Sequence, residues 1–401
     1  MVSFKPCPTK LQPTHMNAQP TRPIVSSHAP QAVSLLTLPD ELIQKIAAHI
    51  VFVPGIYLGS AFISAKPRWA TIAGLASASH DARAVALRAW FSVLILKDEE
   101  DWEVASKFSV IPLFVRELYV HATALGPTTA TDALLTFPAL RAAHINAHND
   151  VTFDSYEGYK YYTLLPIVPR GLKRLALIHA HAPDGERLEA LAQSASELEE
   201  LRLGRCTLFD CATQGCSYWP AFPHDHDAYF SDEGAVEYAT SIAQDLAPIT
   251  SLRVVHLGVY LTPHAALATH QHQHSHIPVL SPSVTAAIPN VDYLIHPPPP
   301  HHLHLLQHPH HRAPLHSPTL WSTPCEACLT QFGPATQIAE HAASSALGNL
   351  VPGLEEISWA GYFERSGQGV SAWRRSVGSK GKSDWVHDGL GLDRVHFDGR
   401  N

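Results

Sequence analysis

Apolar residues near the N-terminus recur at the three- and four-residue spacing that places them on one face of a helix. The residues concerned are Leu42, Ile43, Ile46 and Ile50. We expect this helix to begin at Pro39, because proline suits a first turn, where its missing N–H costs nothing. A second helical region is expected to begin near Trp69 and a third to cover 82–90, with a short buried strand over 91–96.

Beyond residue 110 the pattern changes to a repeated Leu-x-x-Leu-x-Leu unit. The units begin at Val115, Leu140, Leu172, Leu198, Leu252 and Leu354. The first four starts are separated by 25, 32 and 26 residues, and the next interval of 54 is about twice that length. This spacing is typical of leucine-rich repeats of about 20–29 residues with some longer units. Helices are expected between the strands at 185–195 and 233–246.

Each unit is predicted to form a short strand and a returning helix, which cannot bury its apolar side alone. Stacked units would bury a continuous core and leave a curved sheet with an open concave face. The strand positions expected on that face are Tyr119, His144, Ala176, Arg202, His256 and Ser358. Of these, the predicted contacts to a substrate protein are Tyr119, His144, Arg202 and His256. A mixed α/β domain of unrelated parallel βα units is the alternative fold.

The N-terminal helices carry a resemblance to a known family. Leu38-Pro39-Asp40-Glu41-Leu42 opens the first helix, and the stretches 75–79 and 82–87 follow in the second and third helical regions. Over about residues 36–96 this combination resembles the F-box, and with the repeats it resembles fungal-type F-box proteins with degenerate leucine-rich repeats. The resemblance implies an α/β chain, in which an F-box-like three-helix module precedes an irregular leucine-rich-repeat solenoid.

In F-box proteins the first helix and its Leu-Pro entry bind a Skp-type adaptor, which connects them to the cullin scaffold of a ubiquitin ligase. The resemblance implies that this adaptor is contacted by Leu38, Pro39, Leu42 and Ile46, with Leu75 in support. The repeats would hold a target protein for ubiquitin transfer. The chain would then be a substrate-recognition adaptor and not an enzyme, would need no cofactor, and would work in the cytoplasm or the nucleus. A leucine-rich-repeat scaffold with no ligase role is the alternative.

The stretch between the first two helices departs from the F-box pattern. Residues 51–68 form a longer and more apolar gap than usual, which predicts an extra helix or a local insertion. Two alternatives stay open here: an ordinary helical subdomain that packs on the repeats, and a membrane span over the uncharged stretch 46–65. His49, Pro54 and Gly55 make that stretch a poor membrane helix, so no membrane partner is predicted.

Charge and cysteine usage exclude several classes of function. With 36 acidic against 28 basic residues, the chain is not expected to bind nucleic acid. No GxGxxG, P-loop or HExxH motif marks a catalytic site. The six cysteines do not make a disulfide framework, and we expect Cys206, Cys211 and Cys216 to be reduced thiols in an intracellular protein.

A histidine- and proline-rich insert interrupts the repeats at 264–316. Prolines oppose regular helix, and the low complexity predicts a disordered loop. Alternate histidines can bind zinc or copper weakly, which makes a histidine-rich metal-binding protein a further alternative. Cys325 and Cys328 supply half of a zinc site, but no second pair follows at zinc-finger spacing, so no residue is assigned to a metal.

The predicted organisation has a disordered N-terminal segment, a helical module, a repeat domain with its insert, and a C-terminal tail or cap. The boundaries are 1–34, 35–96, 110–363, 264–316 and 364–401. Residues 1–34 lack acidic side chains as a targeting helix would, but their prolines would break such a helix.

Overall fold

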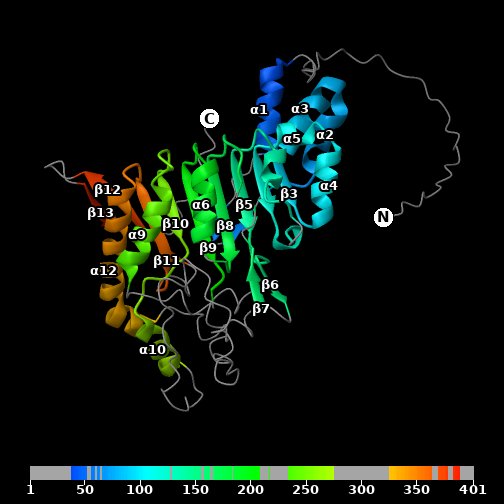
Figure 1. The fold of residues 1–401 in the computed structure, drawn as a ribbon. Helices are drawn as coiled ribbons and strands as arrows, with labels where there is room; N and C mark the ends of the chain where they lie inside the picture. Colours follow the sequence, from blue (N-terminus) through cyan, green and yellow to red (C-terminus); the bar gives the residue numbers. More distant parts are fainter. Residues whose placement is uncertain are drawn as a thin grey trace, which may run out of the picture.

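The computed structural model describes the helical module and most of the repeat domain (Figure 1). The described residues are 38–51, 56–58, 61–63, 66–126, 129–154, 158–162, 165, 167–182, 184–207, 216, 234–274, 325–363, 369–377 and 383–388. The predicted tail over 1–34, most of the insert at 264–316 and the chain beyond residue 388 lie outside these residues.

The N-terminal helices form a small module with a core of its own. Helix α1 (Asp40–Val51) begins directly after Pro39, and two carboxylates in its first turn stabilise the positive end of the helix dipole. Helices α2 (Ala70–Ala78) and α3 (His80–Phe91) complete the module, and Ser79 caps α3 by accepting a backbone N–H. The buried residues that these three helices share are Ile43, Ala47, Val51, Ile72, Leu75, Ala76, Ala82 and Ala86.

The apolar gap between α1 and α2 contains a short hairpin. Its strands β1 (Ile56–Leu58) and β2 (Ala61–Ile63) pair antiparallel. The described residues of this gap therefore form a hairpin, and the expectation of an extra helix is wrong for them. Within the described part of the chain, no helix is both long enough and apolar enough to cross a membrane.

A nine-stranded sheet forms the body of the molecule (Figure 1). Apart from a separate hairpin of β6 (Val151–Asp154) and β7 (Gly158–Tyr161), its parallel strands follow one another in chain order without a reversal. These strands are β3 (Val93–Leu96), β4 (Glu117–Val120), β5 (Ala142–Asn146), β8 (Arg174–Ala180), β9 (Glu200–Arg205), β10 (Val254–Leu257) and β11 (Glu356–Gly361). Doubly wound dinucleotide-binding folds differ, because their strand order reverses at the ligand site.

The repeated sequence pattern coincides with the strand register. In each Leu-x-x-Leu-x-Leu unit, the residue at the second Leu position pairs with the residue at the same position on the next strand. The residue at the third Leu position does the same. The two buried rows are Leu118, Ala143, Leu175, Leu201, Val255 and Ile357, and Val120, Ile145, Leu177, Leu203, Leu257 and Trp359. The six residues that begin the units, from Val115 to Leu354, are also fully buried. The predicted strand positions of the six units are confirmed.

Each unit enters its strand through the same hydrogen-bonded turn. The carbonyl just before one strand accepts the N–H groups of two successive residues at the entry of the next, with N···O distances of 2.7–3.1 Å. These carbonyls belong to Ser92, Arg116, Arg141, Lys173, Glu199 and Arg253. Because buried backbone groups must be paired, this contact fixes neighbouring units in register where their strands begin.

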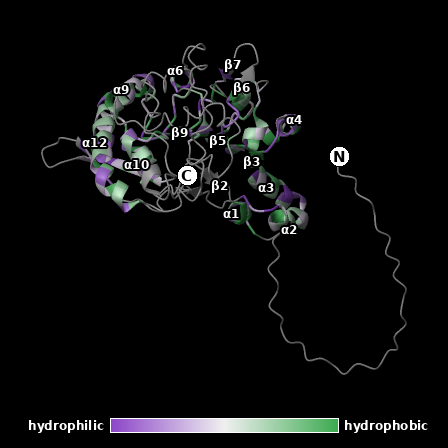
Figure 2. Cartoon of the chain, turned by 90° about the horizontal axis from the view of Figure 1, so that it is seen from below, coloured by the Kyte–Doolittle hydropathy of each residue, from purple (hydrophilic) through white to green (hydrophobic). Residues whose placement is uncertain are grey.

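Helices cover one face of the sheet and follow the outside of an arc in Figure 2. Helices α6 (Gly185–Ser194) and α9 (Ala235–Leu246) lie where the sequence predicts them. Helix α12 (Glu326–Leu350), which packs beside α9, was not predicted. Its buried stripe is rich in small and polar residues and it contains Pro334, so it lacks the pattern of large apolar side chains that marks an amphipathic helix.

Two further helices correct sequence-based expectations. Helix α4 (Glu99–Lys107) follows the predicted strand over 91–96 and was not expected, and Asp98 caps it by accepting a hydrogen bond from a backbone N–H at 3.1 Å. Helix α10 (His264–His274) occupies the beginning of the insert predicted to be a disordered loop. The proline argument fails there because the first proline of the insert is Pro278. The remaining short turns are α5 (Ile111–Phe114), η2 (Ala122–Ala124) and η3 (Ala133–Thr136).

The C-terminal segment closes the sheet with two antiparallel strands, β12 (Gly369–Val377) and β13 (Ser383–His387). Trp385 packs against Gly348 of α12, where an added Cβ would lie 2.5 Å from the indole ring. Trp373 donates its indole N–H to the buried carboxylate of Glu340 at 3.1 Å. The sequence predicted either a tail or a cap over 364–401, and the described residues of this segment form a cap.

Truncating a side chain of the buried rows should destabilise the whole body. We expect Leu201→Ala to lower the free energy of unfolding by about 2–5 kcal/mol, because the cavity sits between neighbouring units. Leu113→Ala, at a side chain 55% exposed on α5, should change it by about 0.5 kcal/mol or less. Urea unfolding followed by circular dichroism measures both, and equal losses would contradict the continuous core.

Candidate functional site

Helix α1 presents two different faces. Ile43 and Ala47 point into the core of the helical module, whereas Leu42 is 44% exposed and Ile46 is 38% exposed. Pro39 is exposed, and Leu38 is half-buried beside the module's core. Leu75, which was grouped with the partner contacts, lies in that core, so it can support the exposed face but offers little surface itself. Leu42 and Ile46 form what we call the α1 face.

The residues predicted for the concave face do form one row across the sheet. Tyr119, His144, Ala176, Arg202, His256 and Ser358 pair in order from β4 to β11. Their burial corrects the prediction of an open face, because the four proposed contacts are only 4–7% exposed. Side chains this deeply covered by their own chain offer little surface to a partner. We call this set the central row.

Neighbouring residues contact the polar groups of the central row. The His144 and Tyr119 rings stack at 4.7 Å between centroids, and His144 Nε2 lies 3.5 Å from Glu117 Oε1. Burial lowers the pKa of His144 despite that carboxylate. Burial acts to raise the pKa of Glu117, but hydrogen bonds from His144 and Tyr119 outweigh it and hold the pKa below its usual value. A neutral imidazole beside a carboxylate is the resulting state.

His256 is the most strongly perturbed member of the central row. Its Nδ1 lies 3.0 Å from Ser358 Oγ, and burial together with the charge of Arg202 lowers its pKa to about 3. Arg202 in turn donates to Glu200 at 2.6 Å. The row is therefore a buried polar layer, in which His256, Ser358 and Arg202 contact one another or a neighbouring carboxylate.

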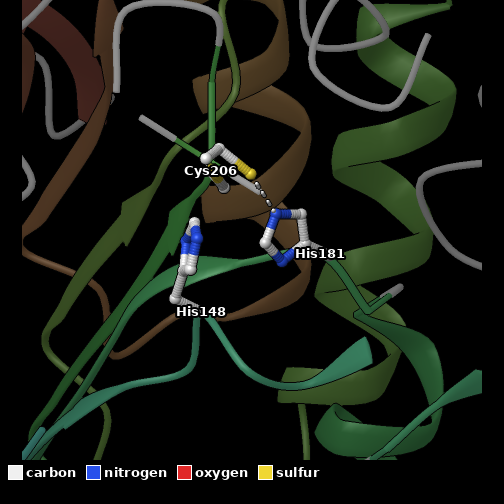
Figure 3. A group of neighbouring side chains, drawn as sticks. His148, His181 and Cys206 are labelled. Atoms are coloured by element: carbon white, nitrogen blue, oxygen red, sulfur yellow. Dashed lines mark hydrogen bonds between the residues drawn. The ribbon is translucent and has the colours of Figure 1, made fainter. Parts of the chain in front are cut away.

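A second group of polar side chains lies at the carboxyl ends of three adjacent parallel strands. His148 follows β5, His181 follows β8 and Cys206 follows β9, and Figure 3 shows the three converging. Cys216, ten residues beyond Cys206, completes the group, and one ligand atom from each of the four lies within 4.8 Å of every other. We call these residues the His2Cys2 cluster. Three of its members are buried and His148 is half-buried.

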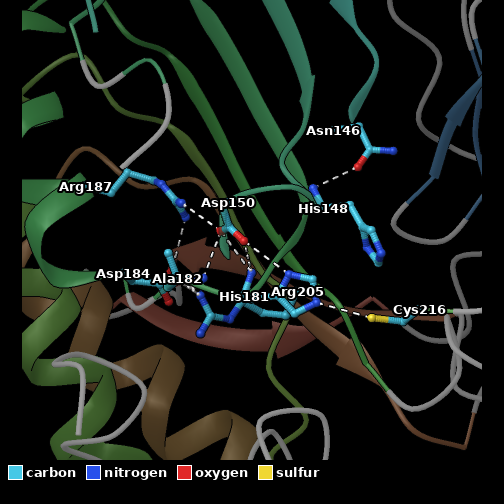
Figure 4. Close-up of polar contacts among 9 residues, drawn as sticks. All are labelled: Asn146, His148, Asp150, His181, Ala182, Asp184, Arg187, Arg205 and Cys216. Carbon is cyan, nitrogen blue, oxygen red and sulfur yellow. Dashed lines mark hydrogen bonds and ion pairs between the residues drawn. The ribbon is translucent and has the colours of Figure 1, made fainter. Parts of the chain in front are cut away.

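A buried carboxylate orients the cluster (Figure 4). Asp150 Oδ1 lies 3.1 Å from His181 Nδ1, which directs the other ring nitrogen, Nε2, toward Cys216 Sγ at 3.5 Å. Asp150 also accepts the backbone N–H groups of His181 and Ala182 at 2.8–3.0 Å and pairs with Arg187 at 3.4 Å. A carboxylate held by this many donors has little freedom to move.

The charges around Asp150 balance one another. Asp184, at the start of α6, pairs with Arg205 at 3.0 Å and accepts from the Tyr238 hydroxyl at 3.3 Å. Two buried carboxylates therefore face two buried guanidinium groups, those of Arg187 and Arg205. Burial acts to raise the pKa of Asp150, but hydrogen bonds from His181 and the charge of Arg187 keep it below its usual value.

His181 responds in the opposite sense. Burial acts to lower its pKa, yet hydrogen bonds to Asp150 and Cys216 raise it to about 9.

Sequence reasoning did not find the His2Cys2 cluster. Cys206 and Cys216 were singled out as thiols, but no finger-like spacing connects them to His148 and His181. The available signal was positional, since three of the four residues come just after strands of successive units, and parallel strands bring such residues to one edge of the sheet. Cys211 lies outside the described residues.

A smaller cluster joins α10 to the start of α12. His270 Nδ1 lies 3.8 Å from Cys328 Sγ, and Cys325 completes a set of three ligand atoms. Burial and the neighbouring Cys325 raise the pKa of the Cys328 thiol to about 12. Within the described residues this set has no fourth ligand.

Comparisons with known proteins do not assign the chain to a family, because neither the models of protein families nor the curated proteins contain a match. The α1 face, the central row and the His2Cys2 cluster are therefore interpreted from their own chemistry.

The central row should make stability depend on pH. His256 is neutral in the folded state down to about pH 3, whereas in the unfolded chain it is protonated below about pH 6.5. Protons then bind preferentially to the unfolded state, so the free energy of unfolding should fall as pH drops through this window, by up to about 1.4 kcal/mol per pH unit. His256→Gln should flatten that slope in urea unfolding at a series of pH values.

The matched control is His80→Gln, which removes an imidazole that is 94% exposed. It should leave the slope of the wild-type protein unchanged. The same slope in the wild-type and His256→Gln proteins would contradict a neutral, buried His256.

Proposed function

We propose that this chain is a non-enzymatic adaptor, whose N-terminal helices bind a Skp-type protein and whose repeats hold a substrate protein for a cullin–RING ubiquitin ligase. The observation that carries the proposal is the α1 face. It joins the Leu-Pro entry expected of an F-box to exposed apolar side chains, on a helix whose opposite side is already packed.

Adjacent exposed apolar side chains that form a patch mark a docking surface more often than a single exposed residue does. Leu42 and Ile46 lie one helical turn apart, which is the spacing by which a helix presents anchors to an apolar groove. The module buries Ile43, Ala47 and Val51 without using these two residues. Its own fold therefore gives no reason for apolar residues at 42 and 46, whereas docking does.

Other exposed apolar residues gather in the same part of the chain. Half of the large apolar side chains that are exposed in the described residues lie between 42 and 113, on the helical module, on α4 and α5, and on the connection between these two helices. They are Leu42, Ile46, Trp69, Val104, Phe108, Val110 and Leu113. This bias supports the N-terminal end as the one that meets the ligase.

The repeated units support a leucine-rich-repeat-like body. Their strands share one register, their turns share one hydrogen-bond pattern, and helices cover one face. A chain of stacked units offers an extended surface suited to protein partners. The central row is too buried to serve as the contact, so the substrate would bind to exposed positions elsewhere on the body. Such a ligase adaptor would act in the cytoplasm or the nucleus.

Charge reversal of the α1 face tests the ligase role. We expect the intact chain to form a stable complex with a Skp-type adaptor in co-purification, and Leu42→Asp with Ile46→Asp to weaken it at least 100-fold, because each carboxylate would be buried unpaired. Circular dichroism should show unchanged helix content, since both side chains are exposed.

The matched control places the same two changes on another helix. Ile338 is 72% exposed and Leu350 is 43% exposed on α12, so Ile338→Asp with Leu350→Asp should leave binding unchanged. If the intact chain forms no complex, or if both double variants bind equally well, the ligase role is wrong, and a scaffold without ligase function becomes the better account.

A further inference from the structure

The His2Cys2 cluster has the composition and number of ligands of a closed structural zinc site. Two imidazoles and two thiolates are the ligand set of a tetrahedral structural zinc ion, and a catalytic site would instead leave one position for water. From these four residues we infer that the protein binds one zinc ion at the carboxyl ends of β5, β8 and β9, through His148, His181, Cys206 and Cys216. This inference is independent of the ligase role.

The distances are compatible with a tetrahedral ion. Zinc–sulfur bonds of about 2.3 Å and zinc–nitrogen bonds of about 2.1 Å require ligand atoms roughly 3.4–3.8 Å apart. Cys216 Sγ and His181 Nε2 are already 3.5 Å apart, and no two of the four ligand atoms are more than 4.8 Å apart. Small side-chain rotations close the remaining difference.

The surroundings hold the ligands in place before a metal arrives. Asp150 accepts from His181 Nδ1 and leaves Nε2 for the metal, which is the carboxylate–histidine arrangement common around zinc. The carboxylate is itself fixed by two backbone N–H groups and by Arg187. At the other histidine, Asn146 Oδ1 accepts the backbone N–H of His148 at 3.1 Å.

The charges also favour a divalent cation. Two thiolates and one zinc ion sum to zero, whereas thiolates buried without a cation are costly. The nearby carboxylates are already neutralised by Arg187 and Arg205, so they do not compete for the metal. Sulfur with imidazole selects zinc over magnesium or calcium, which prefer oxygen.

A bound zinc ion would connect Cys216, which follows β9 in the chain, to the ends of β5 and β8. Cys206 and Cys216 bound to one ion would hold these two residues against the ends of β5 and β8. The two thiols are not joined by a disulfide in the structure. The His270, Cys325 and Cys328 set has only three described ligands and is not included.

Metal analysis of the full chain tests the inference. Protein produced with zinc and dialysed against metal-free buffer should retain it, and Cys206→Ser with Cys216→Ser should lower the content by one zinc per chain, as measured by mass spectrometry of the metal. Cys325→Ser with Cys328→Ser, the control double variant, should retain the zinc that the first pair loses. Unchanged zinc content in the first variant, or a Cys206–Cys216 disulfide in the purified protein, would overturn the inference.

A ligand exchange keeps the test decisive if the double variant does not fold. His148→Cys preserves four ligands at a half-buried position, so zinc should remain bound, and X-ray absorption should show one more sulfur around it. An unchanged sulfur count would show that the metal lies elsewhere.

The role of Asp150 in orienting His181 can be tested separately, by measuring zinc affinity. Asp150→Asn keeps all four ligands and should weaken zinc binding about 10–100-fold in competition with a chelating dye. Asp184→Asn removes an equally buried carboxylate that pairs with Arg205, and it should change affinity no more than about twofold. Equal weakening by both variants would contradict a specific role for Asp150.

Discussion

The pairing of each unit's entry turn with the next is the contact on which the body depends. One carbonyl receives two N–H groups from the following unit, and this happens from Ser92 through Arg253. Because the pairing sets the register, every second and third Leu position meets its counterpart and the apolar rows become continuous. The same register sets the polar positions, so it produces both the central row and the placement of ligands at the strand ends.

The sequence pattern predicted the elements whose packing depends on large apolar residues. It located α1, α2, α6 and α9 and the phase of all six units, because burial of leucine-like side chains leaves a periodic trace. It missed α12, whose buried side is largely small or polar residues such as Ser344 and Gly348, and α10, whose polarity resembles that of the proline-rich chain after it.

Of the candidate sites, one could be predicted from the sequence pattern and two could not. Exposure of Leu42 and Ile46 follows from the helical period, since a helix with Ile43 and Ala47 buried turns the other two outward. Burial of the central row does not follow from the sequence pattern of its own strands, because it depends on residues outside those strands that cover this face of the sheet. The His2Cys2 cluster likewise combines residues from four separate positions between 148 and 216, and only the fold makes them neighbours.

The reversal of direction at β12 and β13 determines where the parallel part of the sheet ends. A parallel unit adds only to a parallel edge with an open entry turn, and after β11 the antiparallel pair occupies that edge, with Trp385 packed on α12. The helical module precedes β3 at the other end. The parallel part of the sheet therefore ends at β11, and the insert at 264–316 lies between β10 and β11 and not at either end of the sheet.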